Sequence, residues 1–219
     1  MKPPGADDGV GTAAGAAPAH PPRVALLGGS FDPVHIGHLH VAEVVLARAG
    51  YDRVLFVPAH LPSHKPAARL AAAAHRVRML QLAVAGHERL AVSDVEVRRG
   101  GVSYTVDTVR ELQARGVIGE RPGLVVGDDL GADLDTWREA ATLFGMVELL
   151  VARRRRSPLP LSWRHRVLAN HRLPISSSEL RRRVGAGQVI RALVPDAVEA
   201  YIREHKLYGS RREDSPPCG

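Results

Sequence analysis

Residues Gly28 to Leu39 constrain this chain more than any other stretch of its sequence, because they place a glycine turn between a strand and a helix. The apolar run Val24 to Leu27 predicts a short buried strand, and the apolar spacing of Leu39 to Ala49 predicts a helix. Such a turn directs backbone N–H groups toward an anion, and Gly28 and Gly29 allow close approach because neither carries a Cβ.

Two histidines add to this turn. His35 and His38 are three residues apart, so they share one face of the helix's first turn if the helix has begun there. From that face they can donate hydrogen bonds to phosphate oxygens. A plain structural turn with two surface histidines would explain one glycine pair or one histidine, but the whole string favours an anion site.

Strands and helices are expected to alternate along the rest of the chain. Further strands are expected at residues 53–57, 90–97, 124–126 and 147–151. Further helices are expected at residues 70–85, 103–115, 175–185 and 195–205, with a short helical region that holds Trp137 and a short helix within 157–171. Several strands are apolar without alternation, which predicts an α/β fold: a doubly wound, Rossmann-like parallel sheet with helices on both faces.

Composition bounds the domain and its surroundings. Residues 1–22 are low in complexity and predict a disordered extension, residues 23–209 one domain, and residues 210–219 a flexible tail. The only cysteine, Cys218, excludes a disulfide framework. No apolar run approaches the roughly 18 residues of a membrane span, so a cytoplasmic protein without a membrane partner is expected. The net charge of +7 suits an anionic partner, either a nucleotide or a nucleic acid.

Four polar segments follow predicted strands. They are the glycine turn, Pro58–Lys65, Gly127–Asp129 and Arg153–Arg154. Parallel strands of a doubly wound sheet bind ligands beyond their carboxyl ends, so these segments are expected to converge there.

The turn resembles the signature Gly-x-Phe-x-Pro-x-His-x-Gly-His of the HxGH nucleotidyltransferase superfamily. The resemblance implies adenylyl transfer, with His35, His38 and Arg181 as the catalytic residues. Ile175–Arg181 is similar to the motif Ile-Ser-Ser-Thr-x-x-Arg of the same superfamily, and it also fits a capping box of Ser176 and Glu179. The residues implied to bind ATP are Gly28, Gly29, Ser30, Phe31, Gly127, Asp129, Arg153, Arg154, Ser176, Ser177 and Ser178.

Other segments resemble the nicotinate-nucleotide adenylyltransferase family. They include Ser103–Thr108, Thr136–Trp137, Pro62–Lys65 and Leu193–Tyr208. The resemblance implies transfer of AMP from ATP to nicotinate mononucleotide, giving deamido-NAD and pyrophosphate in NAD biosynthesis, with Mg²⁺ bound with ATP and no protein metal site. The residues implied to bind the mononucleotide are His64, Lys65, Tyr104, Thr105 and Trp137. Two departures bear on the acceptor pocket: Arg138 stands where many relatives carry Tyr, and the connection 157–173 is short.

Alternatives stay open at this point. A sister nucleotidyltransferase would use nicotinamide mononucleotide or phosphopantetheine. A remote alternative is a basic nucleic-acid-binding protein, although no helix carries a continuous basic face and no specific nucleic acid is expected. Trp137 can also be core filling, and Gly127–Asp129 a simple turn. The sequence leaves the oligomeric state open, a homodimer included.

Overall fold

Strand β1 (Val24–Gly29) lies inside a parallel sheet of six strands in the computed structural model, which describes residues 22–62, 70–155 and 161–209. Within these ranges the strand order is β4-β2-β1-β6-β7-β8. The other strands of the sheet are β2 (Arg53–Pro58), β4 (Leu90–Val92), β6 (Gly123–Gly127), β7 (Glu148–Ala152) and β8 (His165–Val167), and β1 pairs directly with β2 and β6. The first described strand therefore lies inside the sheet and later strands are added on both sides of it, which confirms the expected doubly wound fold.

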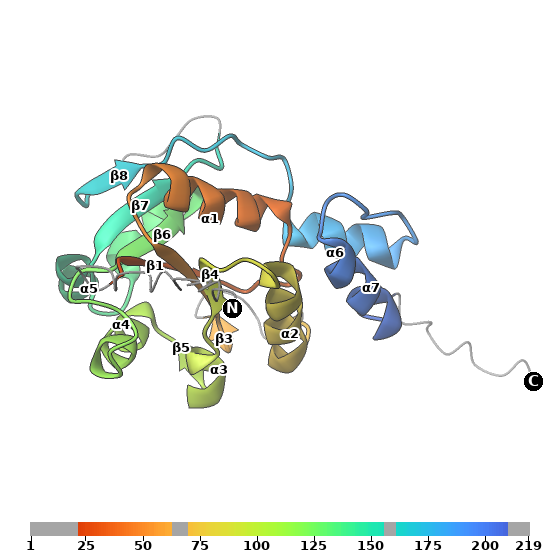
Figure 1. Cartoon of the computed structure of the whole chain (residues 1–219), viewed down its shortest axis with the longest axis horizontal. Helices are drawn as coiled ribbons and strands as arrows, with labels where there is room; N and C mark the ends of the chain where they lie inside the picture. The colour runs from red at the N-terminus through yellow and green to blue at the C-terminus, as the bar shows by residue number, and fades with distance from the viewer. Residues whose placement is uncertain (1–21, 63–69, 156–160, 210–219) are drawn as a thin grey trace, which may run out of the picture.

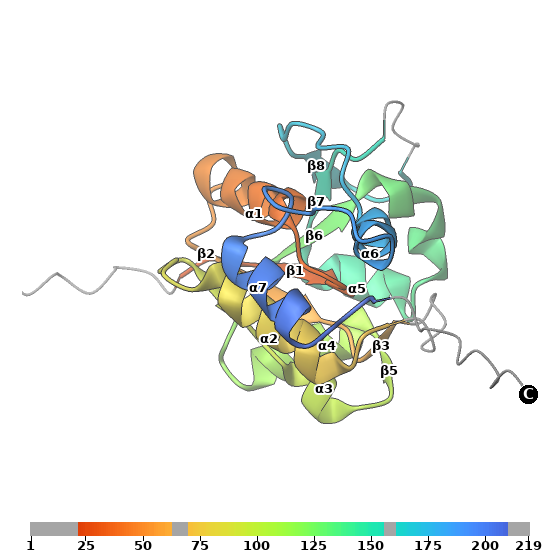
Figure 2. The same ribbon diagram turned by 90° about the vertical axis from the view of Figure 1, so that its right-hand side faces the viewer.

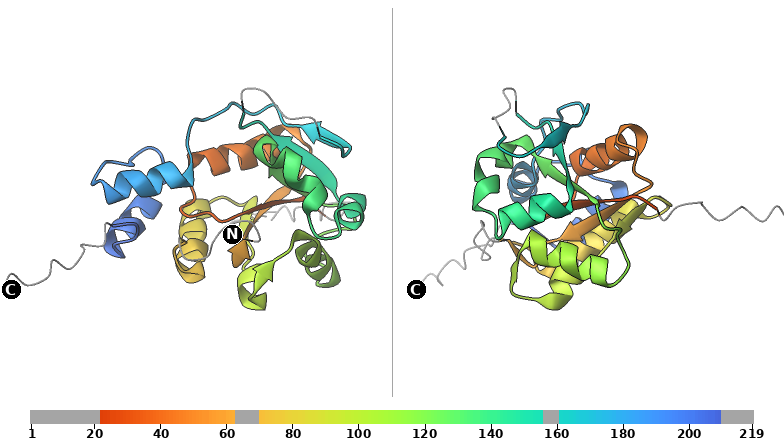
Figure 3. Two further views of the ribbon diagram at one scale, coloured as in Figure 1. Left: turned by 180° about the vertical axis from the view of Figure 1, so that it is seen from behind. Right: turned by 90° about the vertical axis from the view of Figure 1, so that its left-hand side faces the viewer.

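Helices cover both faces of this sheet, and Figures 1 and 3 show α1 and α4 on opposite sides of it. The helices are α1 (Ile36–Arg48), α2 (Ala73–Val84), α3 (Val95–Arg99), α4 (Thr105–Ala114), α5 (Ala140–Met146), α6 (Ser177–Gly185) and α7 (Asp196–Glu204). A 3-10 helix, η2 (Asp128–Thr136), follows β6, and a separate parallel pair joins β3 (Leu61–Pro62) to β5 (Val102–Ser103). No helix in the described ranges is long and apolar enough to cross a membrane.

Alternate residues of β1 supply two hydrophobic cores. Ala25 and Leu27 pack in one core with α1, α2, α6 and α7, whereas Val24 and Leu26 pack in the other with α4 and α5. Successive side chains of a strand point to opposite faces, so a strand without polar alternation is buried on both. That is why the apolar run predicts a covered parallel sheet.

Helices α6 and α7 lie together beyond the end of the sheet where β1 leads into α1 (Figures 1 and 2). Hydrogen bonds tie them to the glycine turn: the Ser177 hydroxyl donates to the Pro33 carbonyl at 2.9 Å, and the Ile36 N–H donates to the Leu193 carbonyl at 3.0 Å. The segment that contains α6 and leads into α7 is thereby fixed against the first loop.

Two expectations were wrong. The strand expected at 90–97 ends at Val92, and Val95 to Arg99 form α3 instead. Two interactions between Arg98 and Asp94 hold this helical turn. The Arg98 N–H donates to the Asp94 carbonyl at 2.8 Å, and the Arg98 guanidinium pairs with the Asp94 carboxylate at 2.9 Å. Alternation over so few residues does not distinguish a strand from one helical turn.

The short helix expected within 157–171 was also wrong, since its described part contains strand β8. This strand is exposed, and its order comes from pairing with β7, as in Arg166 beside Leu150. An exposed edge strand carries no apolar pattern that a sequence could reveal. Trp137 follows η2 directly rather than lying within it. Of the expected terminal segments, all but Pro22 lies outside the described residues.

Candidate active site

The turn after β1 places Phe31 and the two histidines against one another. Phe31 has a left-handed backbone (φ 48°), and its buried ring packs edge-on against His38 with 5.0 Å between ring centroids. A Cβ on Gly29 would come within 3.1 Å of the Phe31 ring. A larger residue at this position would therefore push the buried aromatic ring, which lies directly against the backbone.

The rings of His35 and His38 stack, with centroids 3.8 Å apart. The backbone N–H of His35 donates to Nδ1 of His38 at 3.2 Å, so a neutral His38 ring carries its proton on Nε2. His35 is buried, and neither of its ring nitrogens has a hydrogen-bond partner among the described residues. Burial and then the charge of Arg154 lower the pKa of His35 to about 4, so His35 is neutral at pH 7.

A cavity of about 720 Å³ opens beside this turn at the carboxyl ends of the strands. Most of the predicted site residues line it: Gly28, Gly29, Ser30, Phe31, His38, Tyr104, Thr105, Gly127, Asp129, Trp137, Arg154, Ser176, Ser177, Ser178 and Arg181. Two predicted residues are placed differently. His35 lies in the layer that supports His38, and Arg153 is exposed, with its backbone N–H donating to Asn170 at 2.8 Å. His64 and Lys65 lie outside the described residues.

Gly127 and Asp129 form one wall with Arg154. The Arg154 guanidinium pairs with the Asp129 carboxylate at 3.2 Å. A Cβ on Gly127 would collide with the Asp129 carboxylate and come within 2.6 Å of Arg154 Cδ. A glycine here thus keeps both side chains against the strand end, where a ribose or phosphate group could meet them.

The amino end of α6 supplies hydroxyls and a guanidinium. Ser176 accepts the Glu179 N–H at 3.2 Å, so it caps the helix as expected. The Arg181 guanidinium donates to the Ser178 hydroxyl at 3.2 Å and to the Asp32 carbonyl at 2.7 Å. The helix N-terminus and Arg181 together provide positive potential at the cavity.

Asp32 is a site residue that the sequence did not single out. Its carboxylate is fully buried, accepts the Tyr208 hydroxyl at 2.7 Å and lies 3.6 Å from the Arg181 guanidinium. Burial and the Asp32 charge both raise the pKa of Tyr208, so its proton stays on the oxygen as a donor. A buried carboxylate beside Arg181 fixes where that cation lies.

Arg76 is a second residue that was missed. It is 1% exposed, and its guanidinium donates to four backbone carbonyls, those of Ser30, Ala59, His60 and Ala71, at 2.6–3.0 Å. It therefore ties the glycine turn to the loop after β2. A signal was present: Arg76 precedes Met79, Leu80 and Ala83 at helical core spacing.

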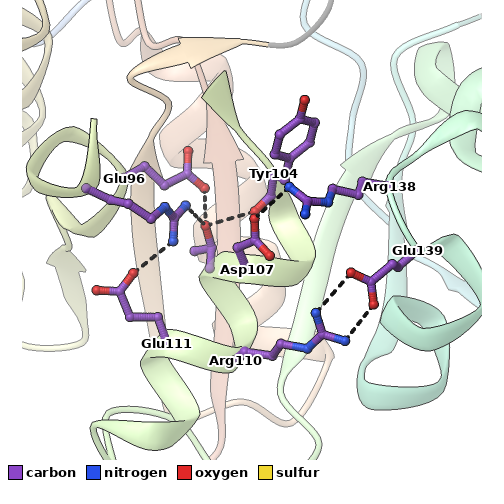
Figure 4. A network of polar contacts seen from close by, with 9 residues as sticks. Glu96, Tyr104, Asp107, Arg110, Glu111, Arg138 and Glu139 are labelled. Atoms are coloured by element: carbon purple, nitrogen blue, oxygen red, sulfur yellow. Dashed lines mark hydrogen bonds and ion pairs between the residues drawn. The ribbon is translucent and has the colours of Figure 1, made fainter. Parts of the chain in front are cut away.

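The Tyr104–Thr105 corner of the cavity is built at the start of α4 (Figure 4). Tyr104 is the N-cap of α4 and Thr105 its first residue. The Thr108 hydroxyl, one turn into the helix, donates to the buried Glu96 carboxylate at 2.6 Å. Burial raises the pKa of Glu96, while the hydrogen bonds from Thr108 and Ser103 oppose that rise. Glu96 thus anchors the start of α4 from beneath the cavity.

Trp137 borders the cavity and also packs against a hydrophobic core. It lines the cavity, packs on the second hydrophobic core and lies 6.2 Å from the Phe144 ring between centroids. The Tyr104 ring has the Arg138 guanidinium over it, with 4.7 Å from Cζ to the ring centroid. The two aromatic residues implied to bind the mononucleotide, Tyr104 and Trp137, therefore both border the cavity.

The comparisons agree with this geometry. The cytidylyltransferase-like family model matches residues 26–183, so the fold and the His-x-Gly-His turn define a nucleotidyltransferase. A relative from Symbiobacterium thermophilum is 42% identical over 198 residues, covering 85% of this chain and 95% of its own length, and another from Synechococcus sp. (strain JA-3-3Ab) is 42% identical over 200 residues, covering 85% and 94%. Both are named "Probable nicotinate-nucleotide adenylyltransferase". The chain therefore belongs to the nicotinate-nucleotide adenylyltransferase family.

A solved structure supports the fold. The Plasmodium falciparum nicotinic acid mononucleotide adenylyltransferase complexed with NaAD superimposes with a TM-score of 0.69 at 18% identity, covering 85% of this chain and 97% of that one. At this identity the likeness bears on the fold alone.

Proposed function

We propose that this protein transfers AMP from ATP to nicotinate mononucleotide, giving deamido-NAD and pyrophosphate. The observation that carries the proposal is the convergence of the glycine turn, Gly127–Asp129, the start of α6 and the Tyr104–Thr105 corner in one cavity. Family membership adds the acceptor, since the relatives are named for it.

The chemistry is an in-line displacement. A phosphate oxygen of the mononucleotide attacks the α-phosphorus of ATP, the bond from that phosphorus to the bridging oxygen breaks, and pyrophosphate leaves with the electron pair. No protein nucleophile is required, so catalysis consists of positioning and of stabilising charge. The Nε2–H of His38 donates to the α-phosphate as charge builds, and Arg181 neutralises the departing pyrophosphate.

Mg²⁺ is proposed to enter as the ATP complex. Among the described residues, no group of three or more His, Cys, Asp or Glu side chains could hold a metal ion. Mg²⁺ commonly takes phosphate oxygens and water molecules as its ligands. The site residues therefore fit a cation that is bound by the triphosphate better than one that is held by protein side chains alone. Bound there, the ion would supply charge neutralisation at the phosphates.

Lys65 stays the proposed contact for the mononucleotide phosphate, with His64 beside it. Pro62 and Leu70, the described residues on either side of segment 63–69, both line the cavity. Strand β3 also pairs with β5, which brings Pro62 beside Ser103 at the acceptor corner. Both ends of the segment thus border the cavity. A cytoplasmic location and the dimeric or other assembly of the protein stay predictions.

Pyrophosphate release from ATP tests the proposal across three acceptors: nicotinate mononucleotide, nicotinamide mononucleotide and phosphopantetheine. We expect nicotinate mononucleotide to exceed its amide in kcat/KM by about tenfold or more, because donors placed for a carboxylate pair poorly with an amide. Equal turnover of acid and amide would contradict the nicotinate assignment, and preference for phosphopantetheine would indicate the sister activity. Salt-sensitive RNA binding without ATP turnover would favour the nucleic-acid alternative.

A further inference from the structure

We propose that Arg138 is a specificity-determining residue whose guanidinium recognises the ring carboxylate of the acceptor. The inference rests on the proposed function and names the side chain that separates an acidic acceptor from its neutral amide.

Arg138 lies at the acceptor end of the cavity. It lines the cavity together with Tyr104, Thr105 and Trp137, and its Cζ is 4.7 Å from the centroid of the Tyr104 ring. Figure 4 shows the Arg138 side chain reaching toward Tyr104 and Asp107 on α4. A planar guanidinium can stack on an aromatic face and still present N–H groups at its edge to a carboxylate, which an ammonium cannot do.

The charged groups around the cavity single out Arg138 as the cation for an acidic ligand at this end. The buried Glu96 carboxylate lines the same part of the cavity, and Asp107 faces Arg138 from α4. Of the two other arginines along the described lining, Arg154 pairs with Asp129 and Arg181 contacts Asp32. Arg138 is the arginine in contact with Tyr104.

The pairing of Arg138 leaves it able to exchange partners. Its distance to the Asp107 carboxylate is 3.4 Å, and its side chain is 51% exposed. The next residue, Glu139, is held much more closely, because both of its carboxylate oxygens accept from Arg110 at 2.6 and 3.1 Å. Glu139 is thus engaged with Arg110 on α4, whereas the Arg138 guanidinium is only loosely engaged.

The test compares Arg138→Gln with Arg138→Lys and the matched control Arg110→Gln. Arg110 belongs to the same network, also loses an ion pair when replaced, and is not among the described residues that line the cavity. In Arg138→Gln we expect the ratio of kcat/KM for nicotinate over nicotinamide mononucleotide to fall about five- to tenfold, mainly through KM for the acid. Arg138→Lys should keep part of the ratio, and Arg110→Gln should keep nearly all of it.

Salt gives a second readout. Because Arg138 is exposed, the wild-type ratio should fall toward that of Arg138→Gln as ionic strength rises, whereas the ratio of the variant should change little. An unchanged ratio in Arg138→Gln, or an equal fall in Arg110→Gln, would overturn the inference. If the wild-type enzyme turns over neither mononucleotide, the proposed function fails instead, so the two failures are distinguishable.

Discussion

The carboxylate of Asp128 accepts the backbone N–H of Arg154 at 2.8 Å and that of Arg155 at 3.0 Å. These two bonds join the chain just beyond β6 to the chain just beyond β7, and Asp129 and Arg154 follow the same two strands. Asp128 is 2% exposed, so its charge is directed inward at these amides rather than at a ligand. It positions one wall of the cavity.

Asp128→Ala should therefore lower both stability and ATP affinity. Two partly buried N–H groups would lose a charged acceptor, at a cost of about 2–3 kcal/mol in the free energy of unfolding. Displacement of Arg154 should also raise KM for ATP severalfold. Urea unfolding and initial rates measure the two effects. Asp133→Ala, an exposed change in the same 3-10 helix, is the control, and a wild-type KM in Asp128→Ala would contradict the positioning role.

His38→Ala should lower kcat by about 10²–10³, the scale found when one preorganised donor to a developing oxyanion is removed. His40→Ala is the matched control, because His40 lies on the same helix and accepts the backbone N–H of His171 at 3.1 Å instead of lining the described cavity. Rates and melting temperatures of both variants are measured. A folded His38→Ala enzyme with near-normal kcat would show that the turn is only structural.

The buried His35 should make the protein sensitive to acid. Its pKa in the folded protein, about 4, is below the ordinary value of 6.5. Between about pH 4 and pH 6.5 the unfolded chain therefore binds a proton at His35 that the folded chain does not bind. Stability from this group is full above pH 6.5, declines as pH falls toward about 4, and is then constant, a total loss of up to about 3 kcal/mol. Urea unfolding from pH 7 to 4 should show a shallower decline in His35→Gln. Parallel curves would contradict the assignment.

Arg76→Met should destabilise the protein by about 3–5 kcal/mol, since four backbone carbonyls would lose their donor inside the domain. The loop holding Ser30 should loosen with it, so KM for ATP should rise as well. Arg78→Met on the same helix, at an exposed position, is the control for losing a positive charge. Equal unfolding curves for the two variants would show that the carbonyl bonds contribute little.

The sequence predicted the parts of the fold that depend on local pattern. Apolar runs such as Val24–Leu27 identify strands because a doubly covered sheet has no polar face. The edge strand β8 and the helix α3 were not predicted, since pairing with β7 and one turn of local bonding leave no periodic signal. Local sequence patterns therefore do not predict an element that forms only by pairing with another strand.

The same division applies to the site. Residues on the motif, such as His38 and Ser176, were predicted because a short string carries them. Asp32, Arg76 and Asp128 were not, because each acts on backbone or side chains far away in sequence. For Arg76 the one sequence signal is its helical spacing from the buried residues Met79, Leu80 and Ala83.

The bond from Tyr208 to Asp32 spans 176 residues and closes the first loop of the domain with nearly its last described side chain. During translation the glycine turn leaves the ribosome long before the tyrosine that completes it has been made. The Asp32 carboxylate therefore cannot be buried with this donor until Tyr208 has been made. A contact of such length delays folding, because the intervening chain must be ordered first. Released chains that lack Tyr208 would thus carry the nucleotide-binding motif without the support that holds Arg181 beside it.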